Sequence, residues 1–154
     1  MRYRMYGLVP YNLSPIQQGI QFGHAVVEYG LRNQDESNDF LDWAKNDKTF
    51  IILNGGTTND KQGSLGTLNT HLQTLRSMGI KVATFNEPDL GDQLTAVIFL
   101  VDERVWDEVK YPTPPPFTEG DIDGQTEDFY NWVDSIGGDN IWNLRVFLKQ
   151  FKLA

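Results

Sequence analysis

Apolar and polar positions alternate along the chain in segments that have the lengths of strands and helices. Four apolar runs bounded by turn residues predict strands, at residues 3–9, 49–53, 80–85 and 94–101. Between these runs, apolar residues recur with helical periodicity, over about residues 15–31, 36–45 and 65–78. This alternation predicts an α/β fold in which helices flank a mixed or parallel sheet of about four strands.

The first helix has a clear start in the sequence. Ser14 is a favourable N-cap, Pro15 suits the first helical position, and Gln17 completes a capping box three residues after the cap. Apolar residues and one glycine then recur at helical spacing, and we expect this stripe to face the core: Ile16, Ile20, Gly23, Val27 and Leu31.

The character of the chain changes after Asp102. Residues 110–124 contain four prolines followed by acidic and glycine residues, which predicts an irregular surface segment. Two short amphipathic helices are predicted beyond it, one around Phe129 to Ile136 and one around Leu144 to Phe151. We interpret residues 1–154 as one domain, with a core over 1–104 and an extension over 105–154.

Composition and charge narrow the classes of function. The chain of 154 residues contains no cysteine and two histidines, so disulfides and thiolate sites are excluded and a transition-metal site is not expected. No apolar run approaches the ~20 residues of a membrane span, and no signal segment is visible at the start. The net charge of −8 is unfavourable for binding nucleic acid, which depends on Lys and Arg contacts to phosphates.

A polar stripe on the first helix holds the strongest candidates for chemistry. Gln17, Gln21, His24 and Glu28 share one edge beside the apolar stripe. Histidine is the side chain best suited to move protons near neutral pH, so His24 is a candidate proton shuttle. The alternative is structural, because Gln17 can serve the helix cap and the pair of His24 and Glu28 is ordinary on a helix surface. We interpret His71, on the third helix, as structural.

Two loops and one basic residue extend the candidate site. The segment Asn54, Gly55, Gly56 follows the second predicted strand and could offer backbone amides to an anion or a carbonyl. Glu87 and Asp89 lie in the loop before the last strand, where α/β sheets place ligands at strand ends, although ordinary turns have the same composition. Arg145 either reaches into a cleft or extends its charge outward from the core.

The segment from Ser14 to Ala25 resembles the first-helix signature of type 2 peptidyl-tRNA hydrolases, in which a lysine-containing start leads into Ala-Gln-x-x-His-Ala. Gln21, His24 and Ala25 match that signature. The predicted order of elements also matches over residues 3–102, and the chain as a whole looks like phage-encoded members of the family. The resemblance implies hydrolysis of the ester of peptidyl-tRNA or aminoacyl-tRNA in the host cytoplasm, without a cofactor.

The sequence differs from the family's pattern at positions that the family uses for catalysis. The family's catalytic lysine falls on Gln17, and its later acidic stretch falls on 86–90, where a carboxylate survives as Glu87 or Asp89. If the chain is an ester hydrolase, we expect His24 to act as a general base on water, with Glu87 or Asp89 orienting it.

Other expected roles are less specific. We expect the side chain of Asn54 or the amides of Gly55 and Gly56 to hold the oxyanion. Substrate contacts are expected at Gln17, Gln21 and Arg145.

A second hypothesis assumes the same fold without catalytic activity. In it, the protein is a catalytically silent relative of the hydrolases that binds a nucleotide-like small molecule or a host protein during infection. The missing lysine and the acidic charge favour this reading, whereas the match at Gln21 and His24 favours the hydrolase. The sequence leaves open whether the chain also forms a homodimer.

Overall fold

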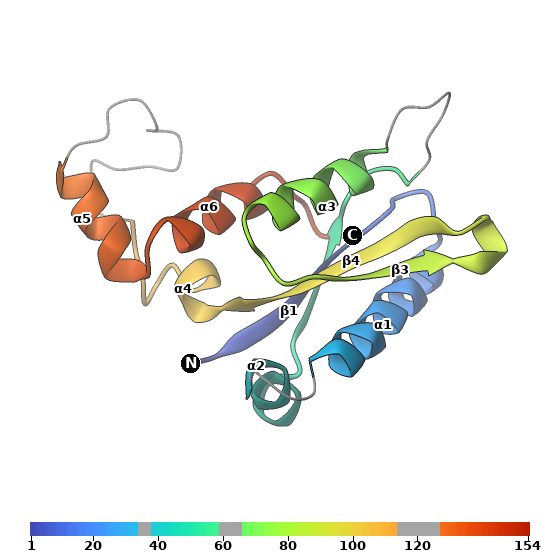
Figure 1. Ribbon diagram of the computed structural model, residues 1–154, viewed down its shortest axis with the longest axis horizontal. Coiled ribbons are helices and arrows are strands. Elements are labelled where there is room, and N and C mark those ends of the chain that lie inside the picture. The colour runs from blue at the N-terminus through green and yellow to red at the C-terminus, as the bar shows by residue number, and fades with distance from the viewer. Residues whose placement is uncertain (34–37, 59–65, 114–126) are drawn as a thin grey trace. The chain divides into compact units, whose positions relative to one another are not determined.

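The structure is a computed structural model that describes residues 1–33, 38–58, 66–113 and 127–154 (Figure 1). The chain divides into two compact units. One unit contains residues 2–101 together with 151–154, and the other contains 102–150 together with Met1. Most of the predicted proline-rich segment lies outside the described residues. Among the described helices, none is long and apolar enough to cross a membrane.

The first unit is built on a sheet of four strands in the order β2, β1, β4, β3. Their bounds are β1 Tyr3–Val9, β2 Phe50–Asn54, β3 Ala83–Glu87 and β4 Gln93–Asp102. Strand β1 pairs parallel to β2, and β3 pairs antiparallel to β4. The sheet is therefore mixed, and this confirms the predicted α/β class with four strands. Strand β3 lies later in the chain than predicted, because it includes Asn86 and Glu87, which were expected in a loop.

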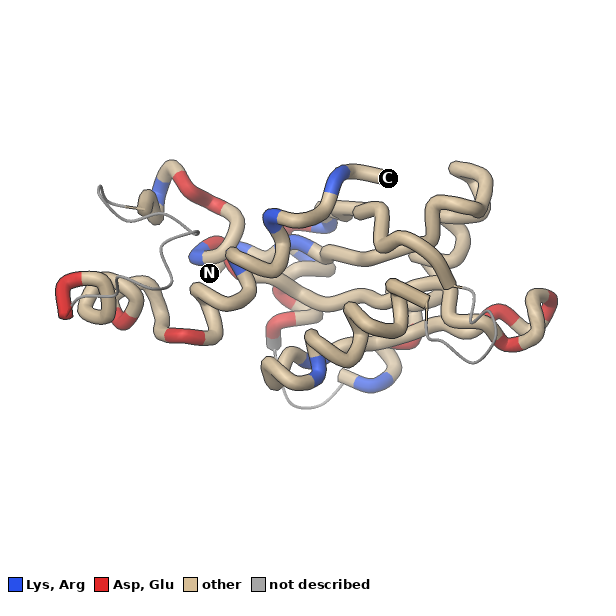
Figure 2. Tube along the Cα trace, turned by 90° about the horizontal axis from the view of Figure 1, so that it is seen from above, with Lys and Arg blue, Asp and Glu red and all other residues tan. Residues whose placement is uncertain are grey.

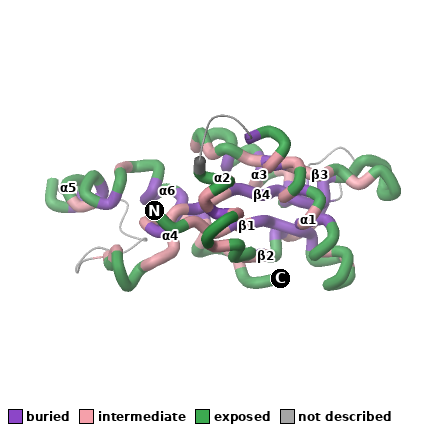
Figure 3. Tube along the Cα trace, turned by 90° about the horizontal axis from the view of Figure 1, so that it is seen from below, coloured by how far each residue is buried: buried purple, intermediate pink, exposed green. Residues whose placement is uncertain are grey.

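Helices cover both faces of this sheet. On β1, Gly7 lies against Phe22 of helix α1 (Pro15–Arg32), whereas Leu8, on the next position, lies near Leu68 of helix α3 (Thr67–Ser77). Successive residues of a strand point to opposite faces, so α1 and α3 cover opposite sides of the sheet (Figure 1). Strands β1 and β4 are largely buried between these layers (Figure 3).

Helix α1 presents a different face to the core from the one its sequence predicts. Its buried residues are Gln21, Phe22, Ala25 and Tyr29. The predicted core stripe is exposed, with Ile16 at 76%, Ile20 at 43%, Val27 at 63% and Leu31 at 60%.

The shape of the sheet beneath helix α1 explains which face of the helix is buried. A Cβ atom on Gly7 would lie 2.3 Å from the ring of Phe22, so the glycine opens a slot that this ring fills. Aromatic residues remove the most apolar surface from water and therefore dominate the packing. The helix thus carries two apolar faces, and its aromatic face is the one that packs.

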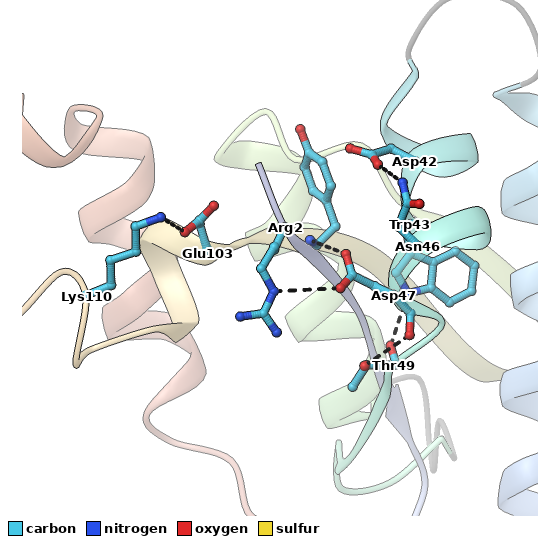
Figure 4. Close-up of polar contacts among 9 residues, drawn as sticks. Arg2, Asp42, Trp43, Asn46, Asp47, Thr49, Glu103 and Lys110 are labelled. Atoms are coloured by element: carbon cyan, nitrogen blue, oxygen red, sulfur yellow. Dashed lines mark hydrogen bonds and ion pairs between the residues drawn. The ribbon is translucent and has the colours of Figure 1, made fainter.

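A short helical segment after α1 is fixed to the start of β1. Helix α2 (Asn38–Asp42) continues into a π-helical turn, η1 (Trp43–Asp47). The carboxylate of Asp47 accepts a hydrogen bond from the Tyr3 amide at 3.1 Å and lies 3.8 Å from the Arg2 guanidinium (Figure 4). The indole of Trp43 donates to the carbonyl of Thr49 at 3.1 Å. These bonds hold the connection against the sheet.

The second unit is helical. It contains α4 (Glu103–Trp106), α5 (Glu127–Ile136) and α6 (Asp139–Leu148). Helix α4 was not predicted, because its four residues are too few for a periodic pattern. Asp102 caps its N-terminus, because the carboxylate of Asp102 accepts from the Arg104 amide at 2.9 Å. The buried Glu103 pairs with Lys110 at 2.6 Å (Figure 4). Phe129, Val133 and Trp142 form the small core between α5 and α6.

Candidate functional site

A cleft of about 410 Å³ lies in the first unit, between helix α1 and the turn that joins β3 to β4. Five polar residues and three apolar residues line it: Gln17, Gln21, His24, Glu87, Asp89, Leu13, Ile20 and Leu90. The five polar residues are all candidates that the sequence had suggested. They come from two segments that are far apart in the chain, so the fold brings them together.

The turn between β3 and β4 is held by its own hydrogen bonds. A 3-10 turn, η2 (Pro88–Leu90), follows Glu87, whose carboxylate accepts from the Asp89 amide at 3.3 Å. The amide of Asp92 donates to the carbonyl of Glu87 at 2.9 Å, and the side chain of Asn86 donates to the carbonyl of Asp92 at 2.9 Å. A left-handed glycine, Gly91 with φ 68°, lets the chain reverse. The turn therefore holds Glu87 and Asp89 in place on one wall of the cleft.

A chain of hydrogen bonds links the buried sheet to this wall. Thr95 on β4 is fully buried, and its hydroxyl donates to Gln21 Oε1 at 2.6 Å. The carboxamide of Gln21 then donates through Nε2 to Glu87 Oε2 at 3.0 Å. Because one end of the carboxamide accepts from Thr95, its other end is directed toward Glu87. Thr95 thus orients Gln21, and Gln21 orients the carboxylate.

Sequence reasoning missed Thr95. The residue stands inside the apolar run 94–101, where it is the one polar side chain before Asp102. A hydroxyl inside a buried strand needs a hydrogen-bond partner. That requirement is the signal that could have pointed to a polar neighbour on the facing helix.

The environment of Glu87 favours its ionised form. The hydrogen bond from Gln21 lowers the pKa of the Glu87 carboxyl below its ordinary value of 4.5, and the Asp89 amide and the charge of His24 lower it further. Since this pKa is depressed, the carboxylate's contribution to folding is complete above the ordinary value and is lost as the pH falls through the folded value. Glu87 is therefore a carboxylate throughout the neutral range.

We predict that Gln21→Leu raises the pKa of Glu87 toward 4.5, because it removes the largest cause of the depression. A pH titration of the Glu87 carboxyl carbon by NMR measures this directly. Gln17→Leu is the matched control, since it removes a carboxamide from the same helix without removing a bond to Glu87. An equal pKa in Gln21→Leu and the native protein would contradict the role of Gln21.

His24 stands on the helix side of the cleft. It is exposed, and its ring packs on Phe85 with 4.4 Å between the ring centroids. Contact with an aromatic ring limits the orientations that the imidazole can adopt. The charge of His24 also acts on Glu87. The cleft therefore combines an imidazole that packs on Phe85 with the ionised carboxylate of Glu87.

The electrostatic character of the cleft is acidic. Glu87 and Asp89 are among its lining residues, and the lining contains neither lysine nor arginine. Acidic positions gather at the turn between β3 and β4 (Figure 2). Within the described ranges, no group of three His, Asp or Glu side chains is arranged to hold a metal ion. The cleft thus favours ligand groups that donate hydrogen bonds or carry positive charge.

Other predicted site residues lie away from the cleft. The amide of Gly55 donates to the Val9 carbonyl at 2.8 Å, and the amide of Gly56 donates to Asn54 Oδ1 at 2.9 Å. These two amides therefore already have acceptors, one at the end of β1 and one in their own loop, and none of the three loop residues lines the cleft.

Arg145 belongs to the second unit and is also absent from the cleft lining. It is buried at 1% exposure, and it donates to the carbonyls of Arg104 and Tyr111 at 2.6 to 2.9 Å. Its guanidinium thus ties α4 and the segment after it to α6 within that unit.

Comparison with known protein families and with curated proteins finds no match, so a functional assignment rests on the chemistry of the cleft itself.

Proposed function

We propose that the cleft hydrolyses a carboxylic ester, and that its substrate is the ester end of a peptidyl-tRNA or aminoacyl-tRNA. One observation carries the proposal: His24, Gln17, Gln21, Glu87 and Asp89 converge on one cleft. This set supplies a base, a charged partner for that base, and hydrogen-bond donors for a carbonyl. The resemblance of the first helix to type 2 peptidyl-tRNA hydrolases supports the choice of substrate.

The proposed reaction begins with His24 as general base. Neutral His24 takes a proton from a water molecule, whose oxygen attacks the carbonyl carbon of the ester. The negative charge of the ionised Glu87 stabilises the imidazolium that forms. The ester C–O bond then breaks, and the imidazolium returns the proton to the leaving ribose oxygen. The second proton of the water stays on the peptide or amino acid, which leaves as a carboxylic acid, so both protons of the water are accounted for.

The cleft offers an uncharged hydrogen-bond donor to the oxyanion of this reaction. Gln17, on which the family's lysine falls in the sequence resemblance, lines the cleft, and its carboxamide can donate a hydrogen bond to the developing charge. A neutral donor stabilises an oxyanion less than an ammonium does. We therefore expect slower turnover than a lysine-containing site would give.

The charge of the cleft also restricts which part of the substrate it can bind. Two carboxylates and the lack of a lining cation disfavour phosphate groups, so the cleft is suited to the aminoacyl or peptidyl end. Asp89 and Glu87 can accept hydrogen bonds from the amine or amide of that end.

Hydrolysis of a labelled peptidyl-tRNA by the purified protein tests the proposal. We expect release of the labelled peptide above the spontaneous rate, with a weak dependence on salt because few phosphates are contacted. A short peptidyl-adenosine ester should be hydrolysed at a similar rate. Absence of release from both esters at high concentration of a demonstrably folded protein contradicts the proposal.

A second candidate function is binding without chemistry. The absence of lysine from the cleft lining favours it, because the site then lacks a cationic oxyanion stabiliser. In this case the cleft binds a small molecule of nucleotide-like shape through hydrogen bonds that the molecule donates, or it binds a host protein. Thermal stabilisation by such a ligand, with no product formed, distinguishes this candidate from the hydrolase.

A further inference from the structure

Helix α1 has three faces, and one of them is apolar and exposed within the described part of its own unit. Its buried face packs on the sheet, and its polar face lines the cleft. The third face contains Ile16, Ile20, Val27 and Leu31, which we call the outward stripe. These side chains are between 43% and 76% exposed. A surface helix normally presents polar residues on the side opposite the core, so an apolar outward stripe indicates a contact surface.

The outward stripe carries no charge. Along α1, all of whose residues are described, the charged residues are Glu28 and Arg32, and neither belongs to the stripe. The chain as a whole has a net charge of −8. Two copies of such a chain repel each other over most of their surface. An uncharged apolar face is where a second copy can approach at the lowest electrostatic cost.

The spacing of the outward stripe matches that of a symmetric contact. Ile16 lies as far before the midpoint between Gly23 and His24 as Leu31 lies after it. Ile20 and Val27 are related in the same way. When two copies of α1 cross antiparallel at that midpoint, Ile16 faces Leu31 and Ile20 faces Val27 of the other copy. A two-fold contact requires this self-complementarity, because the same patch serves both partners.

The centre of the stripe permits close approach of two helices. A Cβ atom added at Gly19 or at Gly23 would meet nothing within 4 Å, so both positions face open space. Glycine lowers helix propensity by ~1 kcal/mol relative to alanine, and neither position is required by packing within the unit. At the crossing point, however, a missing side chain lets the backbones come close enough for the flanking apolar residues to interlock.

From the exposure, charge and spacing together we infer that the outward stripe of α1 docks against the same stripe of a second copy, antiparallel and about a two-fold axis next to Gly23. The contact forms a homodimer. The inference rests on the apolar stripe and needs no catalysis by the cleft, although Ile20 belongs both to the stripe and to the cleft lining, so the contact borders the cleft.

Sedimentation velocity of the full chain tests the association. The native protein is expected to sediment with twice its chain mass of 17.6 kDa. The Val27→Asp variant is expected to sediment with one chain mass, because the substitution places a charge at the apolar contact. Val109→Asp is the matched control, since Val109 is a valine that is 93% exposed in the second unit. It should remain dimeric. Circular dichroism establishes that each variant is folded. A native protein that stays monomeric over the accessible concentrations overturns the inference.

Disulfide trapping tests the geometry, because the chain has no cysteine and single substitutions are therefore unambiguous. Gly23→Cys lies beside the axis and is expected to form a covalent dimer on mild oxidation. Leu31→Cys is expected to stay monomeric, because its copies lie ~22 Å apart along the helices at 1.5 Å per residue. A mixture of Ile16→Cys and Leu31→Cys chains should cross-link. Cross-linking of Leu31→Cys with itself, but not of Gly23→Cys, would show a different contact and overturn the antiparallel arrangement.

Discussion

His24→Ala is expected to lower the rate of ester hydrolysis by ~100-fold to 10,000-fold, the range typical of losing a general base. The substitution removes the proton acceptor that activates water and leaves the ionised Glu87 with no imidazolium to stabilise. The side chain is exposed, so its removal should leave the fold intact. The rate of peptide release from labelled peptidyl-tRNA, compared with the native protein at equal concentration, measures the effect.

The second histidine of the chain provides the control. His71 lies on α3, outside the cleft, and its ring contacts Phe151 with 4.7 Å between the centroids. His71→Ala is expected to keep the native rate of hydrolysis within about twofold, whatever it does to stability. Equal losses in the two variants would mean that the rate reports folding, and His24 would have no catalytic role.

Phe22→Ala is expected to lower the free energy of unfolding by ~3 to 5 kcal/mol, the cost typical of deleting a buried phenylalanine. Phe22 is 1% exposed and fills the slot above Gly7. Urea unfolding at low protein concentration measures the change.

Val27→Ala is the comparison on the opposite face of the same helix. Its side chain is 63% exposed, so the substitution should change the unfolding free energy of the single chain by less than ~0.5 kcal/mol. The measurement is made at a concentration where the chain is monomeric. If Val27→Ala destabilises as much as Phe22→Ala, the outward stripe faces the core after all, as the sequence pattern had suggested.

Much of the fold follows from local pattern. The start of α1 at Ser14 and Pro15 is confirmed, with the Ser14 hydroxyl accepting from the Gln17 amide at 3.2 Å. Strand β1 begins and ends as predicted. The face of α1 could not be predicted in the same way, because the helix has two apolar faces. Which face packs depends on the space above Gly7, and that space exists only after β1 is in the sheet.

The candidate site, too, could be predicted from the sequence only in part. Gln17, Gln21 and His24 share one edge of a helix by helical geometry alone, so sequence reasoning could group them. The loop at Gly55 and Gly56 could not be placed by sequence, because the strand order is a tertiary property. It follows β2 at one edge of the sheet, whereas the cleft borders the turn after β3 at the other edge. Hydrogen bonding from Thr95 to Gln21 likewise appears only when β4 lies beneath α1.

The most direct test of the cleft as the site of function is NMR mapping of a peptidyl-adenosine in which an amide replaces the ester, so that the ligand binds without turnover. The side-chain signals of Gln17, Gln21 and His24 are expected to shift together and to saturate at one ligand concentration. Signals of the loop at Gly55 and Gly56 should remain unchanged. Shifts confined to that loop, or no shifts at millimolar ligand, would contradict the assignment of the cleft.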